Sequence, residues 1–221
     1  MKGVFITFEG PEGSGKTTQA RLLASYLKSQ GYETVLTREP GGTEIGDAIR
    51  KILLNPDFKD MGEVTELLLL SASRAQNVKD RIRPALERGN IVICDRFTDS
   101  TLAYQGFGRR FDIELLMSLN RIATGGIFPE LTILLDLPVE EGLARSRALQ
   151  KEESKAGKGD RIEQEGIDFH RRLREGFLEL ARRDPKRIRV VTAQDKIESA
   201  YKIIKEIAED FLKKTVRGGR D

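Results

Sequence analysis

The sequence has one cysteine, one histidine and no tryptophan among its 221 residues. A single cysteine, Cys94, excludes a disulfide within the chain and is typical of a reducing cytoplasm. Because Cys94 ends an apolar stretch, we interpret it as a small core residue and not as a nucleophile. The single histidine, His170, argues against histidine-based metal clusters and Ser-His triads. Charged residues surround His170 in the sequence, so we expect it on a solvated helix face.

Long hydrophobic runs and a large excess of one charge are also missing. The longest apolar stretch, Val64–Ala72, is interrupted by Thr65 and Glu66 and cannot span a bilayer. No secretory signal pattern follows Met1. The net charge is only +3, although 33% of the residues are charged, and by itself it does not imply a nucleic-acid partner. These features predict a globular cytoplasmic protein that binds neither a membrane nor a nucleic acid.

The most specific local pattern fits the phosphate-binding loop G-x-x-x-x-G-K-[ST]. An apolar strand candidate, Val4–Phe8, precedes the loop, and a helix candidate, Thr18–Lys28, follows it. In this setting the backbone N–H groups and the helix N-terminus favour a bound phosphate. Lys16 is expected to reach the β- and γ-phosphates of a nucleotide, and the Thr17 hydroxyl to bind Mg²⁺. The predicted ATP-binding residues are Gly10, Pro11, Glu12, Gly13, Ser14, Gly15, Lys16, Thr17 and Thr18.

The rest of the chain alternates between strand and helix patterns. Continuous apolar strands that alternate with helices predict an α/β fold, a parallel sheet with helices on both faces. The further predicted strands are Thr34–Leu36, Ile91–Asp95, Leu131–Asp136 and Ile188–Thr192. The predicted helices are Thr43–Leu54, Gly62–Arg88 with a bend at Pro84, Ile113–Ala123, Val139–Leu149, Glu163–Arg183 and Lys196–Lys213. We find no linker or repeat and expect a single domain over residues 1–213, with a flexible basic tail at 214–221.

Arginines near an irregular segment favour phosphoryl transfer over nucleotide binding alone. A GTPase switch is not expected, because no aspartate is followed by glycine three residues later. Arg145, Arg147 and Arg161 bracket the segment 150–159, which is rich in Lys, Glu and Gly. A lid over about 145–161 that carries these arginines would exclude water and neutralise the phosphoryl group in flight. A solvated basic helix end remains the alternative. The predicted class is a small phosphotransferase, with a non-catalytic ATP-binding module as the second possibility.

Several motifs occur together in an order that resembles one family, the bacterial thymidylate kinases (dTMP kinases). The resemblance covers about residues 4–210. Besides the phosphate loop, it rests on Thr37-Arg38-Glu39-Pro40-Gly41-Gly42-Thr43, Arg74-Ala75-Gln76, Asp95-Arg96-Phe97, Ser100-Thr101-Leu102-Ala103-Tyr104-Gln105-Gly106 and Asp160-Arg161-Ile162-Glu163-Gln164-Glu165. The resemblance implies the three-layer P-loop nucleoside monophosphate kinase fold with a five-stranded parallel sheet. It also implies transfer of the γ-phosphoryl group of ATP to dTMP with Mg²⁺, for dTTP synthesis, and commonly a homodimer.

The resemblance also assigns roles to individual residues. Arg96 would hold the dTMP phosphate, Arg74 would contact the thymine edge, and Glu12 would lie near the sugar 3′-hydroxyl. The residues implied to bind dTMP are Glu12, Glu39, Leu70, Arg74, Arg96, Ser100, Thr101, Tyr104 and Gln105. Those implied to act in transfer are Lys16, Arg96, Arg145, Arg147 and Arg161. Thr17, Asp95 and Glu9 are the candidate metal ligands.

Two points remain open at the level of sequence. Asp95 and Asp136 both end apolar strands, and the residues alone do not separate them as the metal-facing acid; the resemblance favours Asp95. Leu70 stands where the family often has a phenylalanine under the base, so selectivity between dTMP and dUMP is open. Another monophosphate kinase, for dCMP, UMP or AMP, would share the phosphate loop and the lid but would need other base contacts.

Overall fold

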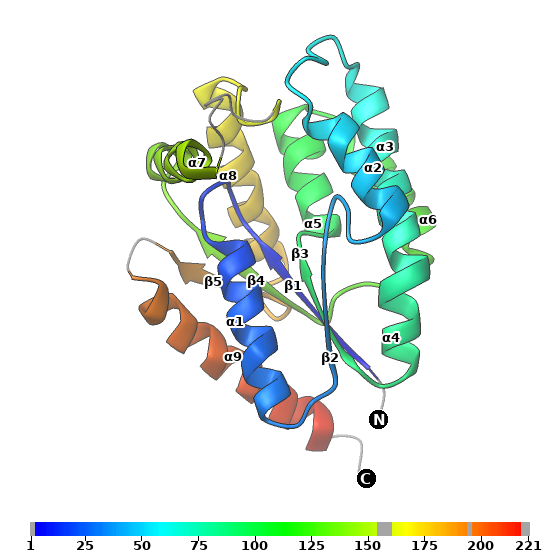
Figure 1. The fold of residues 1–221 in the computed structure, drawn as a ribbon, viewed down its shortest axis with the longest axis vertical. Helices are drawn as coiled ribbons and strands as arrows, with labels where there is room; N and C mark the ends of the chain where they lie inside the picture. Colours follow the sequence, from blue (N-terminus) through cyan, green and yellow to red (C-terminus); the bar gives the residue numbers. More distant parts are fainter. Residues whose placement is uncertain (1–2, 154–160, 194–195, 218–221) are drawn as a thin grey trace.

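A five-stranded parallel sheet forms the centre of the computed structural model, which describes residues 3–153, 161–193 and 196–217 (Figure 1). The strand order is β2-β3-β1-β4-β5, and all neighbouring strands are parallel. The strands are β1 (Val4–Glu9), β2 (Thr34–Arg38), β3 (Ile91–Asp95), β4 (Leu131–Asp136) and β5 (Ile188–Thr192). The predicted parallel sheet is confirmed. No described helix is long and apolar enough to cross a bilayer.

Side chains alternate between the two faces of the sheet, and helices cover both faces. In β1, Ile6 and Phe8 pack in a core with residues of α1 (Lys16–Ser29) and α9 (Ile197–Arg217). Phe5 points the other way, into a separate core that contains Val78, Ile82 and Ala85. This alternation follows from the two-residue period of a strand. Since both faces are covered, the central strands β1, β3 and β4 are largely apolar, whereas the edge strands β2 and β5 carry polar residues such as Arg38 and Arg189.

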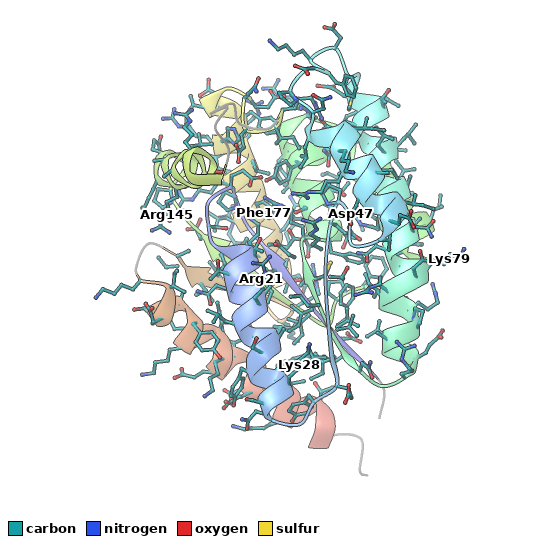
Figure 2. All side chains as sticks on the ribbon, viewed as in Figure 1. Arg21, Lys28, Asp47, Lys79, Arg145 and Phe177 are labelled. Carbon is teal, nitrogen blue, oxygen red and sulfur yellow. The ribbon has the colours of Figure 1, made fainter. Side chains whose placement is uncertain are left out.

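The remaining helices lie at the sides of the sheet. α2, α3 and α6 lie together on one side of the molecule, and α7 and α8 lie on the other (Figure 1). In Figure 2 the side chain of Lys79 lies at the right-hand edge of the molecule, whereas Phe177 of α8 lies in its interior. The bounds are α2 (Glu44–Leu54), α3 (Glu63–Asn77), α4 (Arg83–Glu87), α5 (Thr98–Thr101), α6 (Ile113–Thr124), α7 (Val139–Glu153) and α8 (Ile167–Arg183), with π-helical segments η1 (Val78–Ile82) and η2 (Leu102–Gly108).

The helix bounds differ from the prediction in several places. α7 continues to Glu153, past the predicted end at Leu149 and into the segment that was predicted to be irregular. The long helix ending at residue 88 is divided by η1 directly before Pro84, because a proline removes one N–H and clashes with the preceding turn. α5 and η2 form a helical stretch that the small and polar residues 98–108 did not reveal. α8 starts at Ile167, later than expected. α9 continues to Arg217, so residues 214–217 of the predicted tail are helical, whereas 218–221 lie outside the described residues.

The two singular residues of the sequence are both buried. Cys94 is buried as predicted, and burial raises the pKa of its thiol. The prediction for His170 is wrong, because its side chain is only 1% exposed. The helical period places His170 on the same face of α8 as Leu173 and Phe177, which pack toward the sheet. Burial lowers the pKa of the His170 imidazole, which favours its neutral form.

Candidate functional site

The phosphate-loop sequence follows β1 at the carboxyl edge of the sheet. β3 is the parallel neighbour of β1, with Phe8 in register with Asp95, so both strands end beside the loop. Gly10, Gly13 and Gly15 have φ angles of 137°, 68° and 85°, which side chains rarely adopt. The loop therefore needs glycine at these positions for its shape as well as for access to a ligand.

Lys16 is folded back onto its own loop. Its Nζ donates to the carbonyl oxygen of Pro11 at 2.7 Å and to Ser14 Oγ at 3.3 Å. Burial and, second to it, the nearby positive Arg96 lower the pKa of Lys16 to about 8, against the attraction of Glu12. The ammonium group is thus partly desolvated, and no carboxylate of the described residues is bound directly to it.

A cavity of about 490 Å³ opens over the loop and is lined by cationic side chains. Its walls include Gly13, Gly15 and Thr17 from the loop, and Ser146 from α7. The cations that line it are Lys16, Arg21, Arg38, Arg50, Arg81 and Arg96. This composition suits a polyanion with several negative charges.

A second cavity, of about 100 Å³, adjoins the first. The structure brings together around it all of the residues implied to bind dTMP: Glu12, Glu39, Leu70, Arg74, Arg96, Ser100, Thr101, Tyr104 and Gln105. The sequence analysis missed its other lining residues, Pro40, Arg50, Leu54 and Ile162. Leu54, Leu70 and Ile162 give this cavity an aliphatic surface.

Arg96, Glu12, Glu39 and Arg50 line both cavities and lie at the boundary between them. Arg96 Nη2 donates to Glu12 Oε1 at 2.7 Å, and its Nη1 donates to the carbonyl oxygen of Gly10 at 3.0 Å. Its guanidinium lies 5.0 Å from the ring centroid of Tyr104. Burial opposes both charges, but the attraction between them outweighs it: the pKa of Arg96 is raised, and that of Glu12 is lowered to about 2.

Arg74 is held rigidly at the far wall of the second cavity. Its Nε donates to Glu39 Oε2, and its Nη1 donates to Thr101 Oγ1, each at 2.7 Å. Nη1 also donates to Asn120 Oδ1 at 2.7 Å, and Nη2 to the carbonyl oxygen of Phe97 at 2.8 Å. These contacts use four of the five N–H groups of the guanidinium, and one on Nη2 is left for a ligand. Burial raises the pKa of Glu39 despite this pairing.

The candidate metal ligands occupy different surroundings. Thr17 Oγ1 donates to Asp95 Oδ2, so these two oxygens lie together at the cavity that holds Lys16. Asp136 instead forms a two-bond ion pair with Arg174, at 2.7 and 2.9 Å. Glu9 is fully buried and accepts bonds from the Phe97 N–H at 2.8 Å and from Ser100 Oγ at 2.5 Å. Thr17 and Asp95 are therefore the pair that fits a hard cation such as Mg²⁺.

Burial and, second to it, the negative charge of Asp99 raise the pKa of Glu9 to about 7. A Glu9 carboxyl that keeps its proton near neutral pH is a poor partner for a cation. A role for Glu9 as a metal ligand stays a prediction.

The three lid arginines are not gathered on the phosphate loop. Arg145 donates to the carbonyl oxygen of Ala193 at 2.8 Å and to Glu141 at 2.5 Å, whereas Arg147 is exposed. Arg161 is buried; its Nε donates to the carbonyl oxygen of Leu53 at 3.1 Å, and its Nη2 pairs with Glu66. Part of the predicted lid, residues 154–160, lies outside the described residues. A lid role for these arginines stays a prediction.

Glu66 is the functional candidate that the sequence analysis passed over. It was noted only as an interruption of an apolar run, yet its side chain is 2% exposed. The signal was the spacing of polar residues on α3: Glu66, Ser73, Arg74 and Asn77 are all buried and share one face at helical spacing. A helix with a buried polar stripe next to a substrate cavity marks a binding wall.

The two adjoining cavities, with Arg96 between them, indicate how two ligands could be arranged. A phosphate loop on one side and a second anion site on the other would place two phosphorylated ligands end to end. With the parallel sheet and its strand order, this arrangement defines the class of P-loop nucleoside monophosphate kinases.

Comparison with known proteins narrows the class. The family model "Thymidylate kinase" matches residues 8–204, and the chain belongs to the thymidylate kinase family. Thymidylate kinase of Exiguobacterium sibiricum is 49% identical over 217 residues, which is 98% of this chain and 99% of the relative. That of Thermomicrobium roseum is 57% identical over 189 residues, 86% of each chain. The crystal structure of thymidylate kinase from Ehrlichia chaffeensis matches with a TM-score of 0.75 at 34% identity, covering 95% of this chain and 99% of that one.

Proposed function

We propose that this member of the thymidylate kinase family transfers the γ-phosphoryl group of ATP to the phosphate of dTMP, giving ADP and dTDP for dTTP synthesis. The observation that carries the proposal is the position of Arg96, which faces the phosphate-loop cavity and the second cavity at once. A cation at this boundary can contact the acceptor phosphate at the point where the donor arrives.

The larger cavity takes ATP in this proposal. The loop N–H groups and Lys16 bind the donor phosphates, and Lys16 exchanges its bond to the Pro11 carbonyl for a phosphate oxygen. Thr17 and Asp95 hold Mg²⁺, which neutralises charge on the phosphate oxygens when it is bound. The cations around this cavity stabilise the charge that spreads over the equatorial oxygens during transfer.

The acceptor needs no strong general base. A phosphate monoester has a second pKa of about 6, so dTMP is already largely dianionic at neutral pH. The main obstacle is repulsion between two polyanions. Arg96, released from Glu12 when the acceptor phosphate binds, offsets that repulsion, and Glu12 becomes available to the sugar hydroxyl.

The second cavity suits a thymine base. Thymine carries one N–H, at ring position 3, between two carbonyl oxygens. Arg74 has one N–H left to donate to a carbonyl oxygen, and Gln105 has a side-chain oxygen without a partner among the described residues. Leu54, Leu70 and Ile162 supply apolar contacts to the ring and its methyl group. In this chain aliphatic side chains take the place of the aromatic ring that the family often has at position 70.

We also propose a homodimer and a cytoplasmic location. Exposed apolar side chains gather on helices that pack beside one another: Ile45 and Ile52 on α2, Val64 and Leu68 on α3, and Leu115 and Ile122 on α6. A second copy of the chain that covers this surface would bury it. The single cysteine, which is buried and free, is typical of a reducing compartment.

A substrate panel tests the function. The protein is supplied with ATP and Mg²⁺ and with dTMP, dUMP, dCMP, UMP or AMP in turn, and the diphosphate product is measured. We expect dTMP to give the highest kcat/KM. Preference for another monophosphate would support a related nucleotide kinase instead, and ATP binding with no transfer to any acceptor would support a non-catalytic module.

A further inference from the structure

Glu66 of α3 lies behind the second cavity and binds three side chains from two separate parts of the chain. Its Oε1 accepts a bond from Gln105 Nε2 at 2.9 Å. Its Oε2 pairs with Arg161 Nη2 and with Arg109 Nη2, the latter at 3.2 Å. The carboxylate does not line the cavity itself, so any effect on the substrate must pass through these neighbours.

The contact with Glu66 decides which end of the Gln105 amide faces it. A carboxylate only accepts hydrogen bonds, so the NH₂ end of Gln105 must point toward Glu66. The other end, Oε1, is buried and has no partner among the described residues. Gln105 is 1% exposed and lines the cavity. The amide oxygen is turned away from Glu66, and it is the group of Gln105 that is left to accept a bond from a ligand in the cavity.

We propose that Glu66 is a positioning residue that selects a base with an N–H at ring position 3, such as thymine, over cytosine, because it holds the Gln105 amide with its oxygen available to the base. An acceptor at this wall pairs with the N–H at ring position 3 of thymine or uracil. Cytosine has a bare nitrogen at that position, and two acceptors facing each other repel. The inference rests on the proposed function and adds the residue that sets its choice of base.

The replacement of Glu66 by glutamine has a defined consequence. Two arginine donors, Arg161 Nη2 and Arg109 Nη2, bind Oε2, whereas Oε1 accepts only one longer arginine bond, from Arg109 Nε at 3.4 Å. We therefore expect the amide oxygen of the new side chain to stay at the Oε2 position. Its NH₂ group then faces Gln105, and the Gln105 amide must turn to present its oxygen. The cavity now meets an NH₂ group, which opposes the N–H of thymine and tolerates the bare nitrogen of cytosine.

The experiment compares kcat/KM for dTMP and dCMP in the wild type, in Glu66→Gln and in the control Glu63→Gln. Glu63 lies one turn earlier on α3 and is exposed. We expect Glu66→Gln to lower kcat/KM for dTMP by about tenfold or more, mainly through KM, because a buried donor loses its partner. The ratio of kcat/KM for dTMP to kcat/KM for dCMP should fall by a similar factor. Glu63→Gln leaves both values unchanged.

A variant that lacks the Gln105 amide separates the effect of amide orientation on base choice from a general loss of structure. In Gln105→Met, adding Glu66→Gln should leave the dTMP to dCMP ratio unchanged, because no amide remains to turn. If Glu66→Gln proves unstable by thermal unfolding, the ratio is measured in Glu66→Gln combined with Arg109→Met, which restores the net charge and carries the same expectation. An unchanged ratio in a folded Glu66 variant overturns the inference. A wild type that does not prefer dTMP overturns the proposed function instead.

Discussion

Arg96 occupies a backbone conformation that few side chains adopt, with a φ angle of 71°. The turn after β3 is held by a bond from the Arg96 N–H to the Phe8 carbonyl oxygen at 2.9 Å, and the guanidinium reaches back to Glu12. Strained backbone of this kind persists where the surrounding structure determines it and is frequent at functional sites. At the scale of single residues, Arg96 is therefore the side chain whose loss tests the acceptor site.

We predict that Arg96→Ala raises the KM for dTMP by about ten- to a hundredfold, because a charge-assisted contact to the phosphate is lost. ATP should still bind within a few-fold of the wild-type affinity, since the loop and Lys16 remain. Steady-state kinetics and calorimetric titration with ATP measure the two effects. The matched control is Arg88→Ala, at an exposed position, which should change neither value. Equal losses for ATP and dTMP would remove Arg96 from the acceptor site.

The pKa of Lys16 predicts a pH effect on ATP binding. The pKa of about 8 in the folded protein lies below the ordinary lysine pKa of 10.5. Between these values the unfolded chain binds more protons, so this group makes stability rise with pH in that window. Binding of a phosphate needs the charged form, so the affinity for ATP should fall by up to about tenfold per pH unit above pH 8.

Titration of ATP by calorimetry from pH 7 to 9.5 measures this effect on affinity. Lys16→Arg keeps its charge throughout that range and should show a flat profile even if its affinity is lower. A flat profile for the wild type would contradict the prediction.

At the scale of elements, α7 and the phosphate loop touch through glycines. A Cβ on Gly142 would lie 2.4 Å from the carbonyl oxygen of Glu12, and one on Gly13 would lie 2.1 Å from the carbonyl oxygen of Gly142. Gly142 thus lets α7, which leads toward the predicted lid, approach the loop backbone directly. Any residue with a side chain at either position forces the two elements apart.

We predict that Gly142→Ala destabilises the fold by about 1–3 kcal/mol and lowers kcat/KM for ATP, because the contact is backbone to backbone and cannot relax through a side chain. Thermal unfolding and kinetics measure the change. In Gly166→Ala the added Cβ meets nothing within 4 Å, so this control should keep its ATP kinetics. Unaltered ATP kinetics in Gly142→Ala would mean that α7 does not shape the donor cavity.

At the scale of the whole molecule, the apolar surface over α2, α3 and α6 is the feature that a monomer leaves unexplained. Ile122 on α6 is 79% exposed and Leu68 on α3 is 54% exposed, and these helices pack against each other. α3 also carries Glu66 and Arg74, so a dimer formed through this surface would support one wall of the second cavity from behind.

We predict that Leu68→Lys or Ile122→Lys converts a dimer into a monomer, because a buried unpaired charge is costly at the centre of an interface. Sedimentation equilibrium measures the mass. Ile203→Lys, on α9 at the opposite face of the sheet, serves as the control and should leave the mass unchanged. A wild type that sediments as a monomer at all concentrations contradicts the proposed homodimer.

Local sequence determined much of this protein. The apolar strands, the glycine pattern of the loop and the alternation of strands with helices are short-range signals, so they predicted the parallel sheet and the loop after β1. The motif blocks predicted the family, which the comparisons confirm, and named the residues that the structure brings together around the second cavity.

Only the tertiary structure decided the partners of each polar group. Asp95 lies beside Thr17 while Asp136 pairs with Arg174, and His170 is buried although charged residues flank it. The same is true of Glu66, which meets Gln105 and Arg161 across 39 and 95 positions of the chain. Such contacts join segments that are distant in sequence, and whether a charge is solvated or buried depends on what the fold packs against it.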